Sequence, residues 1–276
     1  METDEEKKWQ NLKKTITKEL NFDTENYTNN FIKRRVACRM RAIKIDDYFA
    51  YSLALQKDKE EQKKLLKELT IHVTNFFRDR EMWNTLETKI LIPLIDAKID
   101  ANDKNLSFWC AGASYGDEPY SLAILLSEIL SKKNKLSNFH IRITAEDIES
   151  KVIEKAKKGE FVDTHFSEMD VSLLEKYFDN INSSFVIKED IKKLIYFRTR
   201  DILSPFGAPK NIDVLFCRNT VIYFEREIKE NLYTKFSEIL KPKGYFVMGK
   251  METLSGPARD DFNCIDTSNK FFRKKS

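Results

Sequence analysis

The chain has 276 residues, 41% of them hydrophobic and 33% charged, which can supply the cores of one or two globular domains. Its 48 basic and 44 acidic residues give a net charge of +4, too balanced to indicate nucleic-acid binding. The four cysteines lie far apart without a CxxC spacing, no apolar run approaches the ~20 residues of a membrane span, and the polar start is unlike a signal peptide. We therefore expect a cytoplasmic protein without a metal site, a disulfide framework or direct membrane insertion.

Glycine and proline are absent from residues 1–92. The first proline is Pro93 and the first glycine is Gly112. Tight turns need these residues, so this part is not a β-sandwich, and residues 9–70 predict three or four helices. We expect an all-α domain over residues 1–75 and a linker over residues 76–105.

One predicted helix in this domain is strongly basic. Ile32, Val36 and Met40 recur at helical spacing, which predicts a buried face. Basic side chains occupy much of the remaining surface, with no acid before Asp46: Lys33, Arg34, Arg35, Arg39, Arg41 and Lys44. Two interpretations stay open, a solvated charged face and a docking surface for an acidic partner.

From Leu106 onward, short apolar runs alternate with helical patterns. The expected strands are residues 106–112, 139–147, 212–219 and 245–250, and the expected helices are residues 118–131, 150–158 and 225–240. This alternation is typical of a parallel α/β sheet that binds ligands at the carboxyl ends of its strands. We expect such a domain over residues 106–276, with a β-subdomain inserted near residues 160–200, where residues 183–200 predict two strands, and a closing hairpin over residues 261–275.

Polar and glycine residues follow several of these strands. Gly112 and Gly116 form a GxxxG turn between strand and helix, which lacks the dinucleotide fingerprint and is by itself almost as consistent with a purely structural turn. Asp147 follows the next strand, where a carboxylate can accept both hydroxyls of a ribose or cap the next helix. Asp201, Arg218 and Asn219 are expected at the same edge. Together these residues suggest a nucleoside ligand without phosphates, and S-adenosyl-L-methionine fits that description.

Six ordered blocks of the sequence carry a family resemblance. They are KRRVACRMRAIKIDDYFAYSLAL, HVTNFFRD, AGASYGDEPYS, TAEDIES, FCRNTVIYFE and LKPKGYFVMGKMETLSG. AGASYGDEPYS is similar to the A-G-x-S-x-G-E-E-P-Y-S motif of the CheR chemotaxis receptor methyltransferases, and FCRNTVIYFE to their F-C-R-N-x-x-I-Y-F motif. The chain resembles this family over nearly its whole length.

The resemblance implies a fold, an activity and a partner. The fold is a Rossmann-like class I S-adenosylmethionine-dependent methyltransferase domain with a small antiparallel β-subdomain, preceded by an all-α domain. The activity is methyl transfer from S-adenosyl-L-methionine to glutamate side chains of chemoreceptors, which yields glutamyl methyl esters and S-adenosyl-L-homocysteine. The partners are the cytoplasmic methylation helices of receptors, and we expect a monomer that docks them.

Roles carried onto this chain by the resemblance fall into three sets. The cofactor-binding residues are Thr74, Arg78, Gly112, Glu118, Asp147, Asp201, Ile202, Arg218 and Asn219. The catalytic residues are Tyr223 and Arg78, and the docking residues are Arg34, Arg35, Arg39 and Arg41.

The sequence departs from the family pattern at several positions. His72 replaces the usual Asn of the linker motif, and residues 81–105 lack an arginine that the family often has. The predicted insert turn, KEDIKK, has no glycine, from which we expect no dependence on a receptor tail.

Two other functions are less consistent with the sequence. A nucleic-acid methyltransferase is disfavoured because a D/N-P-P-Y type of motif is absent. A non-catalytic cofactor- or receptor-binding module is disfavoured because Tyr223 and Arg78 are intact.

Overall fold

The computed structural model describes residues 3–204 and 206–276, apart from the side chain of residue 137. The chain forms two compact units, one made of Met1–Ile71 with Tyr223–Lys229 and the other of His72–Ile222 with Glu230–Ser276. Residues 72–75, expected in the helical domain, and residues 76–105, expected to be a linker, thus belong to the second unit. Within the described residues, no helix is both long and apolar enough to cross a bilayer.

The first unit is a small helical domain. Its helices are α1 (Asp4–Leu20), η1 (Thr24–Asn26), α2 (Asn29–Ala42), α3 (Tyr48–Lys57) and α4 (Lys59–Leu69). Their apolar faces meet in one core that includes Trp9, Leu12, Val36 and Leu65. Side chains cap the N-termini of α1, α3 and α4: Asp58, for example, accepts from the backbone N–H groups of Glu60 and Glu61.

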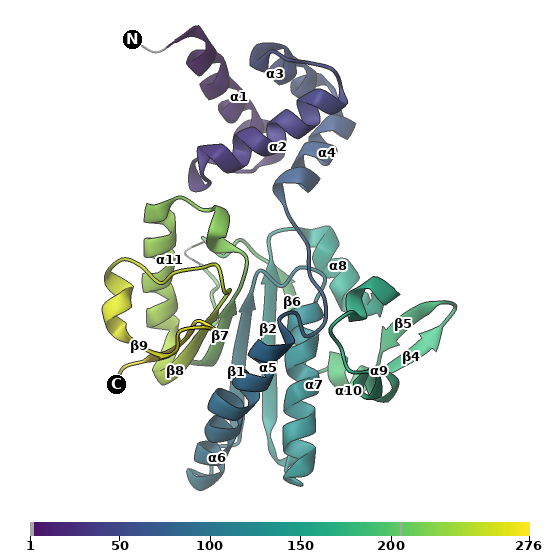
Figure 1. Cartoon of the computed structure of the whole chain (residues 1–276), viewed down its shortest axis with the longest axis vertical. Helices are drawn as coiled ribbons and strands as arrows, with labels where there is room; N and C mark the ends of the chain where they lie inside the picture. The colour runs from purple at the N-terminus through teal and green to yellow at the C-terminus, as the bar shows by residue number, and fades with distance from the viewer. Residues whose placement is uncertain (1–2, 205) are drawn as a thin grey trace. The chain divides into compact units, whose positions relative to one another are not determined.

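A seven-stranded mixed sheet forms the centre of the second unit (Figure 1). Its strands are β1 (Asn105–Ala111), β2 (His140–Asp147), β6 (Ile195–Thr199), β7 (Ile212–Cys217), β8 (Leu240–Met248), β9 (Phe262–Asp266) and β10 (Phe271–Lys274). The order is β6-β2-β1-β7-β8-β10-β9, in which the first five strands are parallel and β10 is antiparallel to both neighbours. The strand order reverses between β1 and β7, so ligands are expected at the carboxyl ends of these strands.

The remaining helices lie partly where the sequence predicts them and partly in residues 80–100, where it predicts a linker. They are α5 (Arg80–Leu86), the π-helical η2 (Glu87–Leu91), α6 (Ile92–Asp100), α7 (Asp117–Lys132), η3 (Leu136–Asn138), α8 (Ser150–Lys158), η4 (Asp163–Phe166), α9 (Val171–Tyr177), α10 (Glu189–Lys192), η5 (Val221–Tyr223), α11 (Arg226–Ile239) and η6 (Pro257–Asp261). The helices predicted after the first, second and fourth parallel strands are confirmed as α7, α8 and α11, and the closing hairpin as β9 and β10.

The inserted β-subdomain differs from the predicted one. Its three-stranded sheet has the order β3 (Glu160–Phe161), β5 (Ser184–Ile187), β4 (Phe178–Ile181). The two-strand insert predicted over residues 183–200 is wrong, because β6 pairs with β2 in the main sheet and α10 fills the supposed turn KEDIKK. The hairpin turn is instead Asn182–Ser183, both at positive φ, as in a type I′ turn. The missing glycine in KEDIKK therefore says nothing about a receptor tail.

Candidate active site

The turn after β1 lies close to the loop after β7. The backbone N–H groups of Gly112 and Ala113 donate to the Glu146 carbonyl at 2.9 and 2.8 Å. Gly112 has a φ of +87°, and a Cβ there would lie 2.3 Å from Thr220 Oγ1. Glycine is therefore required at this position both for its backbone conformation and for the close approach of the two loops.

Asp147, the last residue of β2, holds the glycine turn. Its Oδ2 accepts from the Ser114 N–H at 2.9 Å and its Oδ1 from the Glu149 N–H at 3.1 Å. Burial raises the pKa of Asp147, while the nearby His72 and these N–H groups oppose the rise. The N-cap residue of α8 is Glu149, and no side chain makes a capping bond there. Asp147 therefore holds the turn and the loop after β2, and the alternative role as a helix cap is not seen.

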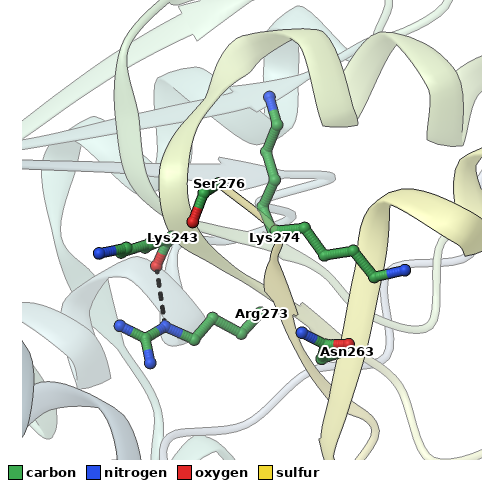
Figure 2. Close-up of a pocket in the computed structure, with 6 residues that line it drawn as sticks. Lys243, Asn263, Arg273, Lys274 and Ser276 are labelled. Atoms are coloured by element: carbon green, nitrogen blue, oxygen red, sulfur yellow. Dashed lines mark hydrogen bonds between the residues drawn. The ribbon is translucent and has the colours of Figure 1, made fainter.

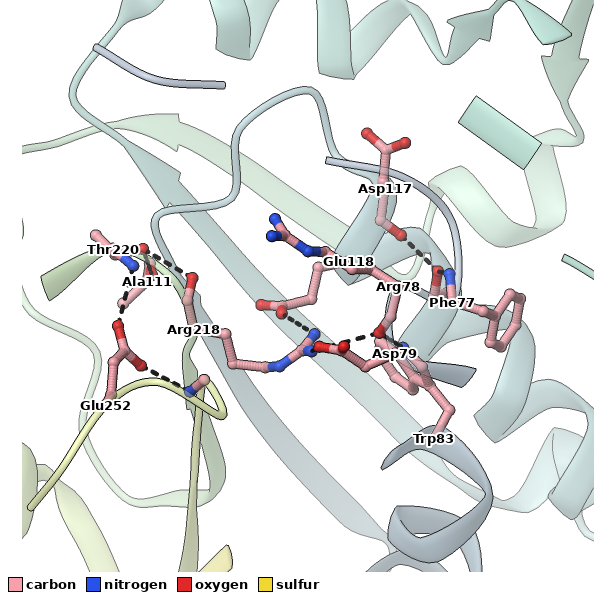
Figure 3. Close-up of polar contacts among 12 residues, drawn as sticks. Phe77, Arg78, Asp79, Trp83, Ala111, Asp117, Glu118, Arg218, Thr220 and Glu252 are labelled. Atoms are coloured by element: carbon pink, nitrogen blue, oxygen red, sulfur yellow. Dashed lines mark hydrogen bonds and ion pairs between the residues drawn. The ribbon is translucent and has the colours of Figure 1, made fainter. Parts of the chain in front are cut away.

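The buried Arg218 is the centre of a charge cluster whose two carboxylates are half-buried (Figure 3). Its guanidinium donates to Glu118 at 3.0 Å and to Asp79 at 2.6 Å. Burial raises the pKa of Glu118, and the charge of Arg218 opposes that rise. Figure 3 shows both carboxylates pointing toward this one guanidinium from separate elements, α7 and the segment before α5. The sequence predicts Glu118 and Arg218 as site residues but gives no role to Asp79.

The segment before α5 is held in an uncommon backbone conformation. Phe77 and Asp79 have φ values of 53° and 64°, which non-glycine residues seldom adopt and which often occur at functional sites. The Phe77 N–H donates to Ser121 Oγ at 2.9 Å, and Trp83 Nε1 donates to the Arg78 carbonyl at 3.1 Å. These bonds fix the backbone of Arg78, whose guanidinium donates to the Val73 carbonyl at 2.7 Å.

His72 and Thr74 lie on the same segment. His72 Nε2 is 2.9 Å from Glu149 Oε2 and the His72 ring lies edge-on to Tyr115. The imidazole that replaces the family's usual Asn therefore engages the loop after β2. Thr74 is half-buried.

Glu252 organises the loop after β7. This buried carboxylate accepts from the N–H groups of Thr220 at 3.2 Å, Val221 at 3.3 Å and Gly249 at 2.6 Å. It thereby fixes the loop that carries Arg218 and Asn219, and Asn219 itself has a φ of 56°. Glu252 lies within one of the family blocks, but the sequence predicts no role for it, because its partners are backbone groups that no sequence pattern identifies.

Asp201 and Ile202 begin the loop between β6 and β7. Asp201 Oδ1 accepts from the Leu203 N–H at 2.9 Å, and Ile202 is buried. Both therefore lie, like Asp147 and Arg218, at or just after the carboxyl ends of parallel strands.

Tyr223 lies in the first unit. Its ring stacks on Phe31 with the centroids 4.4 Å apart, and its carbonyl accepts from the Thr28 N–H at 2.9 Å. Both contacts of Tyr223 are with residues of that same unit.

The basic face of α2 is less free than the sequence suggests. Arg39 is paired with Glu61 of α4 through bonds of 3.1 and 2.7 Å, and Glu61 is only 2% exposed and also accepts from Tyr51. Arg35 lies 3.9 Å from Glu68. The run without an acid before Asp46 therefore does not leave Arg39 and Arg35 unpaired in space, because the acids come from another helix. Arg34 and Arg41 are exposed.

A basic hollow of about 380 Å³ lies beside the first half of β8, at the opposite end of that strand from the loop after Met248 (Figure 2). It is lined by Lys243, Asn263, Arg273, Lys274, Lys275 and Ser276. Arg273 Nε donates to the Lys243 carbonyl at 3.4 Å, and Lys274 Nζ donates to the carbonyls of Ser237 and Leu240 at 2.5 and 3.0 Å. These cations fasten the antiparallel edge of the sheet.

The fold and the site at the carboxyl ends of the parallel strands together define a class of protein. A parallel sheet that reverses at β1 and β7, extended by an antiparallel hairpin and carrying a glycine turn and an acidic end of β2, is a Rossmann-like S-adenosylmethionine-dependent methyltransferase domain. A sequence model described as "CheR methyltransferase, SAM binding domain" matches residues 72–271, and one described as "CheR methyltransferase, all-alpha domain" matches residues 7–70. The chain therefore belongs to the CheR methyltransferase family.

Individual relatives agree with this assignment. A chemotaxis protein methyltransferase of Borreliella burgdorferi is 32% identical over 194 residues, covering 70% of this chain and 68% of that protein. The protein of the same name from Listeria innocua is 29% identical over 274 residues and covers 98% of both chains. The one from Salmonella typhimurium is 26% identical over 241 residues, covering 85% of this chain and 79% of that protein. The chain is thus a methyltransferase of the chemotaxis class, and its cofactor is S-adenosyl-L-methionine.

The residues at the edge fit that cofactor. Among the described residues, the buried Ser114 Oγ and Arg218 Nε have no hydrogen-bond partner within the chain, as expected where a polar ligand completes the bonding. The nearby carboxylates of Glu118 and Asp147 also suit a ligand that carries a positive charge and hydroxyl donors.

Proposed function

We propose that this enzyme methylates glutamate side chains of chemoreceptors, forming glutamyl methyl esters and S-adenosyl-L-homocysteine during chemotaxis adaptation. The relatives' name, chemotaxis protein methyltransferase, supports this substrate class. A glutamate carboxylate is ionised at neutral pH and is itself a nucleophile, so the reaction needs no general base. When bound, S-adenosyl-L-methionine supplies an electrophilic methyl group on its sulfonium.

The observation that carries the proposal is the state of the carboxylates at the edge. Glu118 and Asp79 both accept from Arg218, and Asp147 accepts from two backbone N–H groups. Each is committed to a donor, which is consistent with a reaction in which the protein binds and orients its substrates rather than removing a proton.

We assign the cofactor to this edge residue by residue. Asp147 has lone pairs beyond its two N–H bonds for the ribose hydroxyls, and Asp201 with Ile202 takes the adenine base. The remaining cofactor contacts are Thr74, Arg78, Gly112, Glu118, Arg218 and Asn219. The support is their location in loops after parallel strands, in the first turn of α7 (Glu118) or in the segment that Arg218 holds.

Arg78 and Tyr223 are proposed to act at the methyl-transfer step. The Arg78 guanidinium holds a carboxylate, either that of the cofactor or that of the receptor glutamate, and Tyr223 lines the path of the methyl group. For Arg78 the support is its fixed backbone and its charge near Glu118. For Tyr223 the support is its place in the family motif FCRNTVIYFE.

Receptor docking is proposed for the basic face of α2. Arg34 and Arg41 are exposed and lead this role, whereas Arg35 and Arg39 already have acidic neighbours on α4. Receptor methylation helices that carry acidic side chains would be steered by such a face. We further propose a cytoplasmic monomer that does not bind nucleic acid. The free cysteines Cys38, Cys110, Cys217 and Cys264 suit a reducing compartment.

The proposal is tested by incubating the chain with methyl-labelled S-adenosyl-L-methionine and the chemoreceptors of the same organism. We expect label on receptors that is released by mild base, because methyl esters hydrolyse readily. A receptor whose candidate glutamates are changed to alanine is the control and should take up no label. Absence of label from every receptor would refute the proposed substrate.

A further inference from the structure

Glu146 is a fully buried carboxylate for which the proposed function has no use. It precedes Asp147 on β2, and successive residues of a strand point to opposite faces of the sheet. Its side chain therefore lies on the other face from Asp147, where the sheet register sets it directly beside Arg198 of β6.

Two arginines and a tryptophan surround this carboxylate. Arg200 Nη1 donates to Glu146 Oε2 at 2.9 Å, and Trp109 Nε1 donates to the same oxygen at 3.1 Å. Arg198 Nε donates to Oε1. A buried carboxylate costs much free energy unless it is paired and hydrogen-bonded, so Glu146 holds both arginines in fixed positions.

The same arginines bind the loop between β6 and β7. Arg200 donates to the carbonyls of Phe206 at 3.0 Å and Ser204 at 2.8 Å, and Arg198 donates to the carbonyl of Gly207. The Phe206 side chain is 82% exposed, so apolar packing of that side chain does not hold this part of the loop. The loop is instead fastened to the sheet through the guanidinium groups.

We propose that Glu146, Arg198 and Arg200 form a clamp that positions this loop and so sets how strictly the enzyme recognises the adenine base of its cofactor. The inference rests on the proposed function, in which Asp201 and Ile202 at the start of the loop contact the base. The clamp residues themselves do not touch the cofactor; they are positioning residues. Glu146 also serves the glycine turn, because its carbonyl accepts from Gly112 and Ala113.

Adenine recognition can be measured as a ratio of two affinities. Calorimetry on the full chain gives the Kd for S-adenosyl-L-homocysteine and for S-inosyl-L-homocysteine, in which an oxygen replaces the 6-amino group of the base. In Glu146→Gln the neutral amide no longer pairs with two guanidiniums. We expect the preference for adenine to fall about tenfold, the effect of about one charge-assisted hydrogen bond. An unchanged ratio would overturn the proposal.

A second variant covers the case in which Glu146→Gln does not fold. Arg200→Lys keeps a positive charge next to Glu146 but cannot span the carbonyls of Ser204 and Phe206. It should fold and should still lower the preference for adenine, and a ratio equal to that of the unaltered chain would count against the clamp.

Asp213→Asn is the matched control. Asp213 is also a buried carboxylate between two cations, Lys98 at 3.1 Å and Lys241 at 2.8 Å, but it lies near the start of β7, at the other end of the strands. It should lower the melting temperature and leave the adenine preference unchanged. If it changes the ratio as much as Glu146→Gln does, general destabilisation explains the effect and the clamp is refuted.

Asp201→Ala separates this inference from the function on which it rests. If that variant keeps the adenine preference, the assignment of Asp201 to the base is wrong. If it loses the preference while Glu146→Gln and Arg200→Lys keep it, the assignment holds and the clamp proposal fails. Loss of the preference in all three variants supports both.

Discussion

The loops at the carboxyl edge of the sheet and the basic face of α2 present charge in opposite ways. At the edge, Arg218 and Asp147 are buried and each makes two or more hydrogen bonds to fixed partners. On α2, Arg34 and Arg41 are exposed. The first arrangement suits recognition of a small ligand by preorganised groups, and the second suits steering of a large charged partner. The difference predicts that changes at the edge alter stability and cofactor affinity, and changes on α2 alter receptor kinetics.

The largest effect is expected from Arg218→Gln. The change leaves the carboxylates of Glu118 and Asp79 without the guanidinium they share. Removing one partner of a buried ion pair costs about 3 to 5 kcal/mol, so the free energy of unfolding in urea should fall by that order. Arg142→Gln, at an exposed position of β2, should change it little. Equal effects of the two variants would show that the cluster is not a special feature of the edge.

Asp147→Ala is expected to weaken cofactor binding about a hundredfold, the equivalent of ~2.7 kcal/mol. The variant removes the proposed ribose acceptor and also frees the Ser114 N–H, which positions the glycine turn. Calorimetric titration with S-adenosyl-L-homocysteine measures the change, and Glu154→Ala on the exposed side of α8 serves as the control. A Kd within about twofold of the unaltered chain would contradict the assignment of Asp147.

Arg34→Glu combined with Arg41→Glu should raise the KM for receptor about tenfold and leave the Kd for cofactor unchanged. Reversing two exposed charges opposes docking of an acidic partner without disturbing a buried pair. Lys14→Glu with Lys18→Glu, an equal charge change on exposed positions of α1, separates local docking from net charge. Unchanged receptor kinetics in the α2 variant, or an equal effect in the α1 variant, would contradict docking at this face.

Arg39 is expected to differ from the exposed arginines of α2. Its partner Glu61 is buried, so Arg39→Ala should lower stability rather than act mainly on receptor binding.

The smallest effect is a pH dependence at His165. His165 Nδ1 lies 2.6 Å from Asp117 Oδ1, and this bond raises the pKa of His165 above its ordinary value of 6.5. Burial raises the pKa of Asp117, while His165 opposes the rise. A raised histidine pKa contributes stability that is fully present below pH 6.5 and is lost as the pH rises through the raised value.

His165→Gln should therefore lower the free energy of unfolding by about 1 kcal/mol more at pH ~6 than at pH ~9. Urea titrations at both pH values measure the difference, and His140→Gln at the exposed start of β2 is the control. An equal loss at both pH values would show that the pair does not titrate with folding.

Local patterns were sufficient to predict most elements of the fold. Apolar runs and their glycine, proline and polar boundaries predict β1, β2, β7 and the helices between them, because each of these elements is defined by its own sequence. The insert was mispredicted because the pairing of its second expected strand depends on a distant part of the chain. The residues of β6 look like the second strand of a hairpin, but they pair with β2, some fifty residues earlier in the chain, for example Thr199 with Asp147.

The residues of the candidate site also differ in whether a local sequence pattern predicts them. Gly112, Glu118, Asp147 and Arg218 are found from motifs and strand ends, whereas Asp79, Glu146 and Glu252 are not. Asp79 bonds Arg218 across 139 residues and Glu146 bonds Arg200 across 54. Arg39 shows the converse error, since its basic run looks unpaired until Glu61 on another helix is considered. Side chains that position other groups through long-range contacts leave no local signal.

Mass spectrometric mapping of methylation on an isolated receptor tests whether this enzyme methylates glutamate side chains. The receptor is incubated with S-adenosyl-L-methionine and either the unaltered chain or the Asp147→Ala variant. We expect methyl esters on glutamate side chains with the unaltered chain and strongly reduced modification with the variant. Methylation confined to other residue types, or no methylation of any receptor by an enzyme that binds its cofactor, would contradict it.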